Sequence, residues 1–264
     1  MDISIITRSL RADELLTFLR NVQPLIESGD EIVAVVKNHN IDLSAFTNLR
    51  ILESDSNRFQ ARVLGIKMAR NDGILLLDSD QYLNEYLIKE IKDVNSAVVM
   101  IPEVSDGGTV FSSLLDCQRG HFFKLSKIYG GSPLVPAVPR FYRKDLLMKA
   151  LNEMEKHYFI DGLSHEDSIL YYYVFKYIKN IYFAENPIIN QNDSFSTTLR
   201  KSYLYGKFYS TAMQSPNIEL EIKELIKKLN ISMLVPFRKE IGFNPFVVVN
   251  FLRMIPYGLG KSHR

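Results

Sequence analysis

The sequence of 264 residues predicts an α/β fold with a mainly parallel central sheet flanked by helices. Short apolar runs alternate with helical patterns through roughly the first hundred residues, as a series of βαβ units requires. The run Ile74–Leu77 is apolar at every position, which is typical of a strand that is buried on both faces. No run reaches the ~18 consecutive apolar residues that a membrane-spanning helix needs.

The strands of the first half are short apolar segments, each set apart from the next by a helical or polar stretch. The predicted strands are Ile3–Ile6, Glu31–Val36, Leu49–Leu52, Ile74–Leu77 and Ala97–Ile101. A helix with its apolar residues on one side is predicted between Leu15 and Ile26, and another over Asn57–Arg70. Glycine-containing segments at Ser28–Gly29 and Asn71–Gly73 end these two helices.

The second half is less regular. A helix is predicted over Thr109–Tyr129, where a Gly-Gly-Ser-Pro segment ends it, and a second helix over Glu166–Lys176. Ile181–Phe183 is predicted to be a short strand, and two more helices follow Ser196.

Composition excludes several classes of protein. Hydrophobic residues make up 46% of the chain, which suits a domain with a sizeable core. The formal net charge of +2 is too small to indicate nucleic-acid binding, so we expect no nucleic acid among the partners. The single cysteine, Cys117, excludes an internal disulfide framework and a cysteine-based zinc site. The first residues lack a secretory pattern, so we expect a cytoplasmic protein.

Two carboxylates follow the predicted strand Ile74–Leu77 directly, in the sequence Asp78-Ser79-Asp80. In open α/β sheets, ligands bind beyond the carboxyl ends of the strands. Alternate side chains of an extended chain point to opposite sides, so a turn is needed for both acids to reach one centre. A hard divalent cation that also binds phosphate oxygens needs only one or two carboxylates and water. The alternative is that these acids only start a turn and cap the following helix.

The sequence around the two acids supports the ligand-binding interpretation. Residues 58–83 resemble the central signature of family 2 glycosyltransferases, which have the GT-A fold. That family carries an Ala-Arg-Asn-Xaa-Gly-Ile helix, followed by an apolar strand that ends in Asp-Xaa-Asp and a Leu. The matching residues here are Ala61, Arg62, Gly65, Ile66, Asp78 and Asp80. The resemblance extends with falling clarity from residue 1 to about residue 210.

The resemblance implies a nucleoside-diphosphate sugar donor whose diphosphate is held through Mg²⁺ or Mn²⁺. Asp80 is then the more direct metal ligand, with Asp78 nearer the ribose or the water shell of the metal. The cation would offset the charge that develops on the departing nucleoside diphosphate. The alternative for Arg62 is a residue on the helix surface. The residues assigned to the donor side are Thr7, Arg8, Lys37, Arg62, Asp78, Ser79 and Asp80.

A second acidic pair, Glu166-Asp167, follows a glycine-containing loop and opens a predicted helix. Transfer with inversion needs a general base that accepts the proton of the acceptor hydroxyl. The resemblance makes Asp167 this base, while Glu166 orients it or binds the acceptor. Alternatively, both acids only complement the helix dipole, with Ser164 as the cap. The further residues assigned to the acceptor side are Arg140, Tyr142 and His165. For the segment Pro139–Lys144, an amphipathic edge strand is the alternative.

Three features depart from the family pattern. The first strand keeps Thr7 but follows it with Arg8, where the family commonly ends in Pro-Thr. The second strand ends at Lys37 where acidic residues are usual, which leaves the nucleobase open. Residues 187–192 offer only amides where many family members have a histidine that completes the metal site.

The domain organisation follows from the extent of the resemblance. We expect a GT-A catalytic domain over residues 1–214, with a nucleotide-sugar-binding half at 1–101 and an acceptor-binding half at 102–214. A helical extension is expected over residues 215–264.

The segment 225–264 is basic and apolar: it has seven Lys or Arg and one acid, Glu240. This composition predicts docking on an anionic membrane surface, and packing on the domain or on a second subunit is the alternative. A peripheral position on the cytoplasmic face of a membrane would suit a lipid-linked acceptor.

The sequence therefore predicts a metal-dependent inverting glycosyltransferase that acts on a glycan or a lipid-linked acceptor. One alternative is a sugar-phosphate nucleotidyltransferase, but its glycine-rich triphosphate loop is missing from Thr7–Arg11. The other is a non-catalytic homologue that binds a nucleotide-sugar or a partner.

Overall fold

A computed structural model describes most of the chain, and its residues group into two compact units. The described residues are 1–37, 42–157, 166–191, 194–215, 218–234, 237–238, 242–243 and 255–259. Unit 1 comprises Met1–Val104, Pro139–Leu151 and Tyr177–Gln191. Unit 2 comprises Ser105–Val138, Asn152–Lys176 and Asn192–Arg264.

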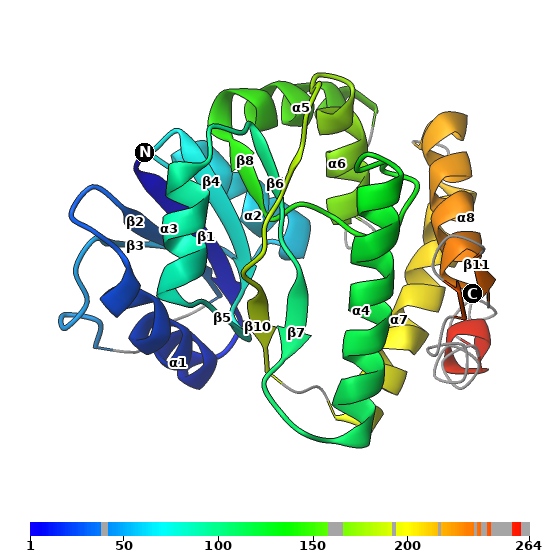
Figure 1. Ribbon diagram of the computed structural model, residues 1–264, viewed down its shortest axis with the longest axis horizontal. Coiled ribbons are helices and arrows are strands. Elements are labelled where there is room, and N and C mark those ends of the chain that lie inside the picture. Colours follow the sequence, from blue (N-terminus) through cyan, green and yellow to red (C-terminus); the bar gives the residue numbers. More distant parts are fainter. Residues whose placement is uncertain are drawn as a thin grey trace. The chain divides into compact units, whose positions relative to one another are not determined.

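Unit 1 is built on a seven-stranded sheet of order β3-β2-β1-β4-β8-β6-β9, as far as the chain is described (Figure 1). The strands are β1 (Ile3–Ser9), β2 (Glu31–Val36), β3 (Leu49–Glu53), β4 (Gly73–Asp78), β6 (Val98–Met100), β8 (Phe141–Arg143) and β9 (Tyr182–Phe183). Four of its six neighbouring pairs are parallel, and only the two pairs that include β8 are antiparallel. This sheet confirms the predicted α/β fold class.

Helices cover both faces of this sheet (Figure 1). Helices α1 (Ala12–Val22) and α3 (Glu85–Asp93) bury their apolar sides against one face, in a core that includes Phe18 and Leu87. Helix α2 (Arg58–Met68) lies on the other face. A short 3-10 helix, η1 (Gln23–Leu25), follows α1. Helix α5 (Lys144–His157) follows β8.

Local sequence signals explain the element that leads to the paired acids. Strand β4 is buried at every position from Gly73 to Leu77, because the apolar run meets helices on both sides. Asn57 caps α2 by accepting a hydrogen bond from the amide of Gln60, and Asn84 caps α3 in the same way. The acids therefore lie at the end of a buried strand, a few residues before a capped helix.

Strand β8 differs from the sequence-based alternative of an edge strand. It lies between β4 and β6, inside the sheet, and both Phe141 and Tyr142 are buried. The edge-strand interpretation is therefore wrong. Of the basic residues that suggested an amphipathic edge, Arg140 and Lys144 flank this short strand and Arg143 is its last residue, so none is part of its buried centre.

A smaller sheet was not predicted. It consists of β5 (Gln81–Tyr82), β10 (Ile188–Asn190) and β7 (Glu103–Ser105), in the order β5-β10-β7. Strand β5 begins immediately after the paired acids and runs antiparallel to β10. This sheet therefore determines the direction that the chain takes beyond β4.

Unit 2 is mainly helical in its described part. Its helices include α4 (Val110–Ile128), α6 (Glu166–Phe175), α7 (Phe195–Gln214) and α8 (Leu220–Leu234). Two short strands, β11 (Phe237–Arg238) and β12 (Gly242–Phe243), pair with each other. The helix predicted over Thr109–Tyr129 is confirmed as α4.

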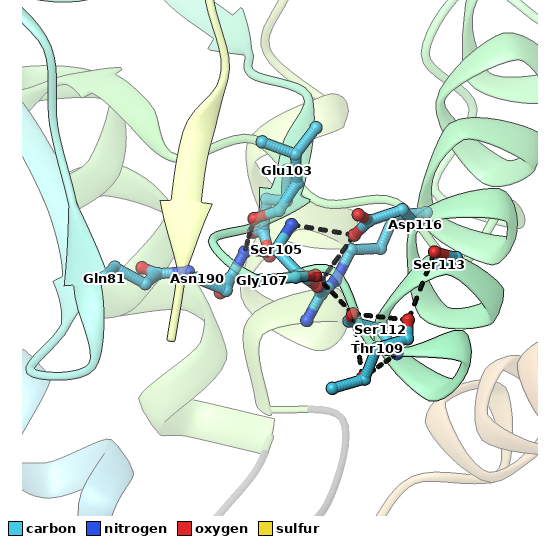
Figure 2. Close-up of polar contacts among 11 residues, drawn as sticks. Gln81, Glu103, Ser105, Gly107, Thr109, Ser112, Ser113, Asp116 and Asn190 are labelled. Carbon is cyan, nitrogen blue, oxygen red and sulfur yellow. Dashed lines mark hydrogen bonds and ion pairs between the residues drawn. The ribbon is translucent and has the colours of Figure 1, made fainter. Parts of the chain in front are cut away.

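Polar contacts close the turn that precedes α4 (Figure 2). Thr109 caps the helix by accepting from the amide of Ser112 at 3.0 Å. Asp116 accepts hydrogen bonds from both the amide and the hydroxyl of Ser105, at 2.8 Å each. Arg119 also donates to the Ser105 hydroxyl. The turn is thus held by its own helix.

The C-terminal segment 225–264 lies largely outside the described residues beyond α8. In the part of the chain that is described, no helix is both long and apolar enough to cross a membrane. Docking of this segment on a membrane surface stays a prediction.

Gly65, one of the residues of the family signature, marks a close approach of α2 to β1. A Cβ atom at Gly65 would lie 2.5 Å from Cγ2 of Ile6, a β-branched side chain that is 1% exposed. Gly65→Ala is therefore expected to lower the free energy of unfolding by about 1–3 kcal/mol. Gly120→Ala in α4 is the control, because a Cβ there meets no atom within 4 Å. It should raise the free energy of unfolding by about 0.5–1 kcal/mol. Urea unfolding measures both, and equal effects would contradict the packing argument.

Candidate functional site

The carboxyl edge of the parallel strands brings several of the predicted donor-side residues together. In the register of β1 and β4, Arg8 is the Cα partner of Asp78. Lys37 follows the last residue of β2, and its ammonium group lies 3.5 Å from the exposed carboxylate of Asp55. Thr7 precedes Arg8 on β1 but is buried below the edge. Its hydroxyl oxygen has no hydrogen-bond partner among the described residues.

The paired acids lie on a tight turn, as a common ligand requires. Strand β4 ends at Asp78, Ser79 and Asp80 form the turn, and β5 begins with Gln81. The side-chain oxygen of Gln81 accepts a hydrogen bond from the Asp78 amide at 2.9 Å. The carbonyl of Asp80 accepts one from the Gln191 amide at 2.8 Å. The turn is therefore tied to Gln191, the residue that follows β10 (Ile188–Asn190).

Arginines surround the carboxylate of Asp78. Nη2 of Arg62 lies 2.6 Å from Oδ1 of Asp78, and Nη2 of Arg58 lies 3.2 Å from the same oxygen. Nη2 of Arg140 lies 3.8 Å from Oδ2. The Arg62 side chain is only 4% exposed, which excludes the alternative that Arg62 is a residue on the helix surface. It is a buried cation paired with the first acid of the turn.

These contacts limit how the site could hold a cation. Within the described ranges, no three His, Cys, Asp or Glu side chains are placed to hold a metal together. The Asp78 carboxylate faces three guanidinium groups, which disfavour a further cation beside it. Asp80 is the remaining acid of the pair. One carboxylate with phosphate oxygens and water is sufficient for Mg²⁺, so the residues present fit the metal only in this minimal form.

The second acidic pair opens α6 in unit 2. Glu166 is buried, Asp167 is half-buried, and Ile169 and Leu170 of the same helix are buried as well. Both acids lie in the first turn, as predicted. His165 and Ser164 fall outside the described residues. The role of Asp167 as a base stays a prediction.

The other two residues assigned to the acceptor side both make contacts inside unit 1. Arg140 forms an ion pair with Glu103 at 2.7 Å. Tyr142 is 1% exposed, and its hydroxyl donates to the carbonyl of Pro139 at 2.9 Å. This placement favours a structural role for Tyr142 in the sheet.

Sequence reasoning missed Arg58 and the polar residues of the small sheet. Arg58 precedes Arg62 by four residues, and this spacing on a helix places both on one face. The spacing was therefore a usable signal. For Glu103 and Asn190 there was no signal, because strands of two or three polar residues show no periodicity.

Comparison with known proteins gives a fold and no family. No protein-family model and no curated protein matches the sequence. Among solved structures, the crystal structure of S. aureus TarS 1–349 matches with a TM-score of 0.51 and 16% identity, over 99% of this chain and 90% of that chain. Its complex with UDP-GlcNAc matches with a TM-score of 0.50 and 14% identity, over 99% and 91% of the two chains. A longer TarS structure matches with a TM-score of 0.53 and 15% identity, and this chain covers 55% of its length. At such identities the likeness shows a shared fold.

The ion pair between Arg62 and Asp78 predicts a large effect on stability. Arg62→Ala leaves Asp78 without its shortest ion pair and opens a gap under α2, so the free energy of unfolding should fall by about 3 kcal/mol. Arg20→Ala, on the exposed side of α1, is the control and should have almost no effect. Urea unfolding followed by circular dichroism compares the two variants. Near-identical unfolding curves for the two variants would show that the ion pair between Arg62 and Asp78 does not stabilise the fold.

Proposed function

We propose that this protein is a metal-dependent, inverting glycosyltransferase. It transfers a sugar from a nucleoside-diphosphate sugar to a hydroxyl group of a glycan or a lipid-linked acceptor. The observation that supports this proposal most is the Asp78–Asp80 turn at the carboxyl edge of β4, in a fold shared with TarS, which was crystallised with UDP-GlcNAc.

The cationic residues of this edge suit a diphosphate. Arg8, Arg58 and Arg62 lie around Asp78 or in register with it. Guanidinium groups are well suited to phosphate oxygens because they offer several donors in a fixed plane. With the two acids of the turn and these three arginines, this part of the edge still has one more positive charge than negative, which would attract the donor.

The two acids of the turn would have different tasks. Asp80 would hold Mg²⁺ or Mn²⁺, and the bound cation would offset negative charge on the leaving nucleoside diphosphate. Asp78, fixed by arginines, would lie nearer the ribose or the water shell of the metal. In unit 2, Asp167 would accept the proton of the acceptor hydroxyl at its carboxylate, and Glu166 would orient it.

A non-catalytic nucleotide-sugar-binding protein is the second candidate. Two observations favour it. The carboxylate of Asp78 is already paired with arginines. Gln191, which contacts Asp80, has an amide side chain in the segment where many members of the resembled family have a histidine that completes the metal site. Such a protein would bind the donor and release no product.

A ligand panel separates the two candidates. Thermal unfolding is measured with UDP-GlcNAc, other UDP-sugars and GDP-sugars, each with and without Mn²⁺, and the release of nucleoside diphosphate is followed. A metal-dependent rise in melting temperature together with product release supports the enzyme. Binding without release supports the second candidate, and no response to any sugar nucleotide contradicts both.

The C-terminal segment would bring the enzyme to its acceptor at an anionic membrane surface. Removing residues from 237 onward should abolish binding to vesicles that contain phosphatidylserine, because five basic residues and the apolar clusters from Phe243 onward would be lost. Vesicle flotation measures this. Binding that persists in the shortened chain, or no binding by the intact chain, would favour packing of the segment on protein.

A further inference from the structure

A row of buried polar side chains connects the Asp78–Asp80 turn to the small sheet. Gln81 is 1% exposed and Asn190 is 8% exposed. The Gln81 oxygen accepts from the Asp78 amide, and its nitrogen donates to Oδ1 of Asn190 at 2.9 Å. Figure 2 shows Gln81, Asn190 and Glu103 in this row.

The row continues from Asn190 and returns to the turn. Nδ2 of Asn190 donates to Oε2 of Glu103 at 3.3 Å. Oε1 of Glu103 accepts from Nε of Arg140 at 2.8 Å, and Nη2 of Arg140 lies 3.8 Å from Asp78. The contacts therefore form a closed ring that begins and ends at Asp78.

The chemistry of the ring fixes the orientation of each amide. An ionised Glu103 can only accept, so Asn190 must present its nitrogen to it. Asn190 then presents its oxygen to Gln81, which in turn presents its own oxygen to the backbone amide of Asp78. A single reversed group would leave buried donors or acceptors facing each other, and such networks tolerate this poorly.

The ring also controls the second acid. Gln191 is the neighbour of Asn190 in the chain, and its amide donates to the carbonyl of Asp80. A shift of Asn190 would therefore displace the Gln191 amide that contacts Asp80. The same shift would displace Gln81, whose side-chain oxygen accepts from the Asp78 amide.

We infer that Gln81, Asn190 and Glu103 are positioning residues that hold the acidic turn in the geometry that receives the donor. The expected effect on donor binding rests on the proposed function, whereas the expected effect on the structure of the Asp78–Asp80 turn does not. Loss of such supporting partners typically lowers ligand affinity or activity by about 10–100-fold.

The central variant is Asn190→Asp. It keeps the oxygen that faces Gln81 but replaces the donor that faces Glu103 by a negative charge. The matched control is Asn186→Asp, because the Asn186 side chain donates to Oε2 of Glu90 at 2.9 Å in the same segment but outside the ring. Both variants place a carboxylate against a glutamate. The double variant Asn190→Asp with Glu103→Gln restores one donor and one acceptor and keeps the net charge of the ring.

Two readouts distinguish positioning from general stability. Hydrogen exchange without ligand is measured at the amides of Asp78 and Gln191 and, for reference, in β2. Donor affinity with Mn²⁺ is measured by calorimetry. We expect Asn190→Asp to accelerate exchange at both turn amides and to weaken donor affinity by about 10-fold or more, while β2 stays protected. Asn186→Asp should change neither quantity, and the double variant should recover much of both.

The outcomes separate this inference from the proposed function. Equal exchange in Asn190→Asp and Asn186→Asp, or faster exchange in β2 to the same extent, overturns the positioning role. If the wild-type chain binds no sugar nucleotide, the proposed function fails and the exchange data still decide on the ring. If Asn190→Asp does not fold, Glu103→Gln alone gives the same test, because it keeps the shape of the side chain. We expect smaller changes in hydrogen exchange and donor affinity from this variant.

Discussion

Asp80→Asn is expected to abolish metal-dependent binding of the nucleotide-sugar donor, with a loss of affinity of about 100-fold or more. The substitution exchanges an anionic oxygen ligand for a neutral one, which a hard cation binds weakly. The backbone carbonyl of Asp80 still accepts from the Gln191 amide, so the turn itself should persist. Calorimetric titration of the donor in the presence of Mn²⁺ measures the effect.

The control for this variant lies at the other end of the same strand. Asp72 is exposed in the turn that precedes β4, and Asp72→Asn changes the net charge of the chain by the same amount. It should bind the donor as the wild type does. If Asp80→Asn retained its full Mn²⁺-dependent affinity, Asp80 would not be the metal ligand.

Asp167→Asn is expected to leave donor binding intact and to slow sugar transfer by about 10²–10⁴-fold. An amide cannot accept the proton of the acceptor hydroxyl, whereas the donor contacts proposed at the Asp78–Asp80 turn involve other residues. Initial rates of nucleoside-diphosphate release, measured at saturating donor, test this directly. Calorimetry on the same preparation shows whether binding is spared.

Asp145→Asn tests the simpler explanation that acids at a helix start only complement its dipole. Asp145 is an exposed acid in the first turn of α5, just as Asp167 lies in the first turn of α6. Its substitution should leave the rate of transfer unchanged. If Asp167→Asn transferred sugar at the full rate, Asp167 would not be the general base.

The strands that lead to the site were predictable because their sequences allow few alternatives. A continuous apolar run such as Ile74–Leu77 must be buried on both faces, and β4 is buried in this way. A helix was expected to follow the paired acids, and α3 does follow them, capped by Asn84. The small sheet could not be predicted, because its strands of two or three residues are stabilised by contacts with distant segments.

For the candidate site, the sequence indicated which acids lie at the strand end but not which partners they have. The turn at Ser79 was required for a common ligand and is present. The three arginines around Asp78 come from α2 and from the residue before β8, which only the fold brings together. The burial of Tyr142 likewise follows from the position of β8 inside the sheet.

The most direct test is a calorimetric titration of wild-type protein with UDP-GlcNAc and then with other sugar nucleotides, in Mn²⁺ and again in EDTA. We predict saturable binding of at least one of these donors in Mn²⁺ and its loss in EDTA. Absence of binding to every sugar nucleotide in Mn²⁺ would contradict the account that the Asp78–Asp80 turn receives a metal-bound diphosphate.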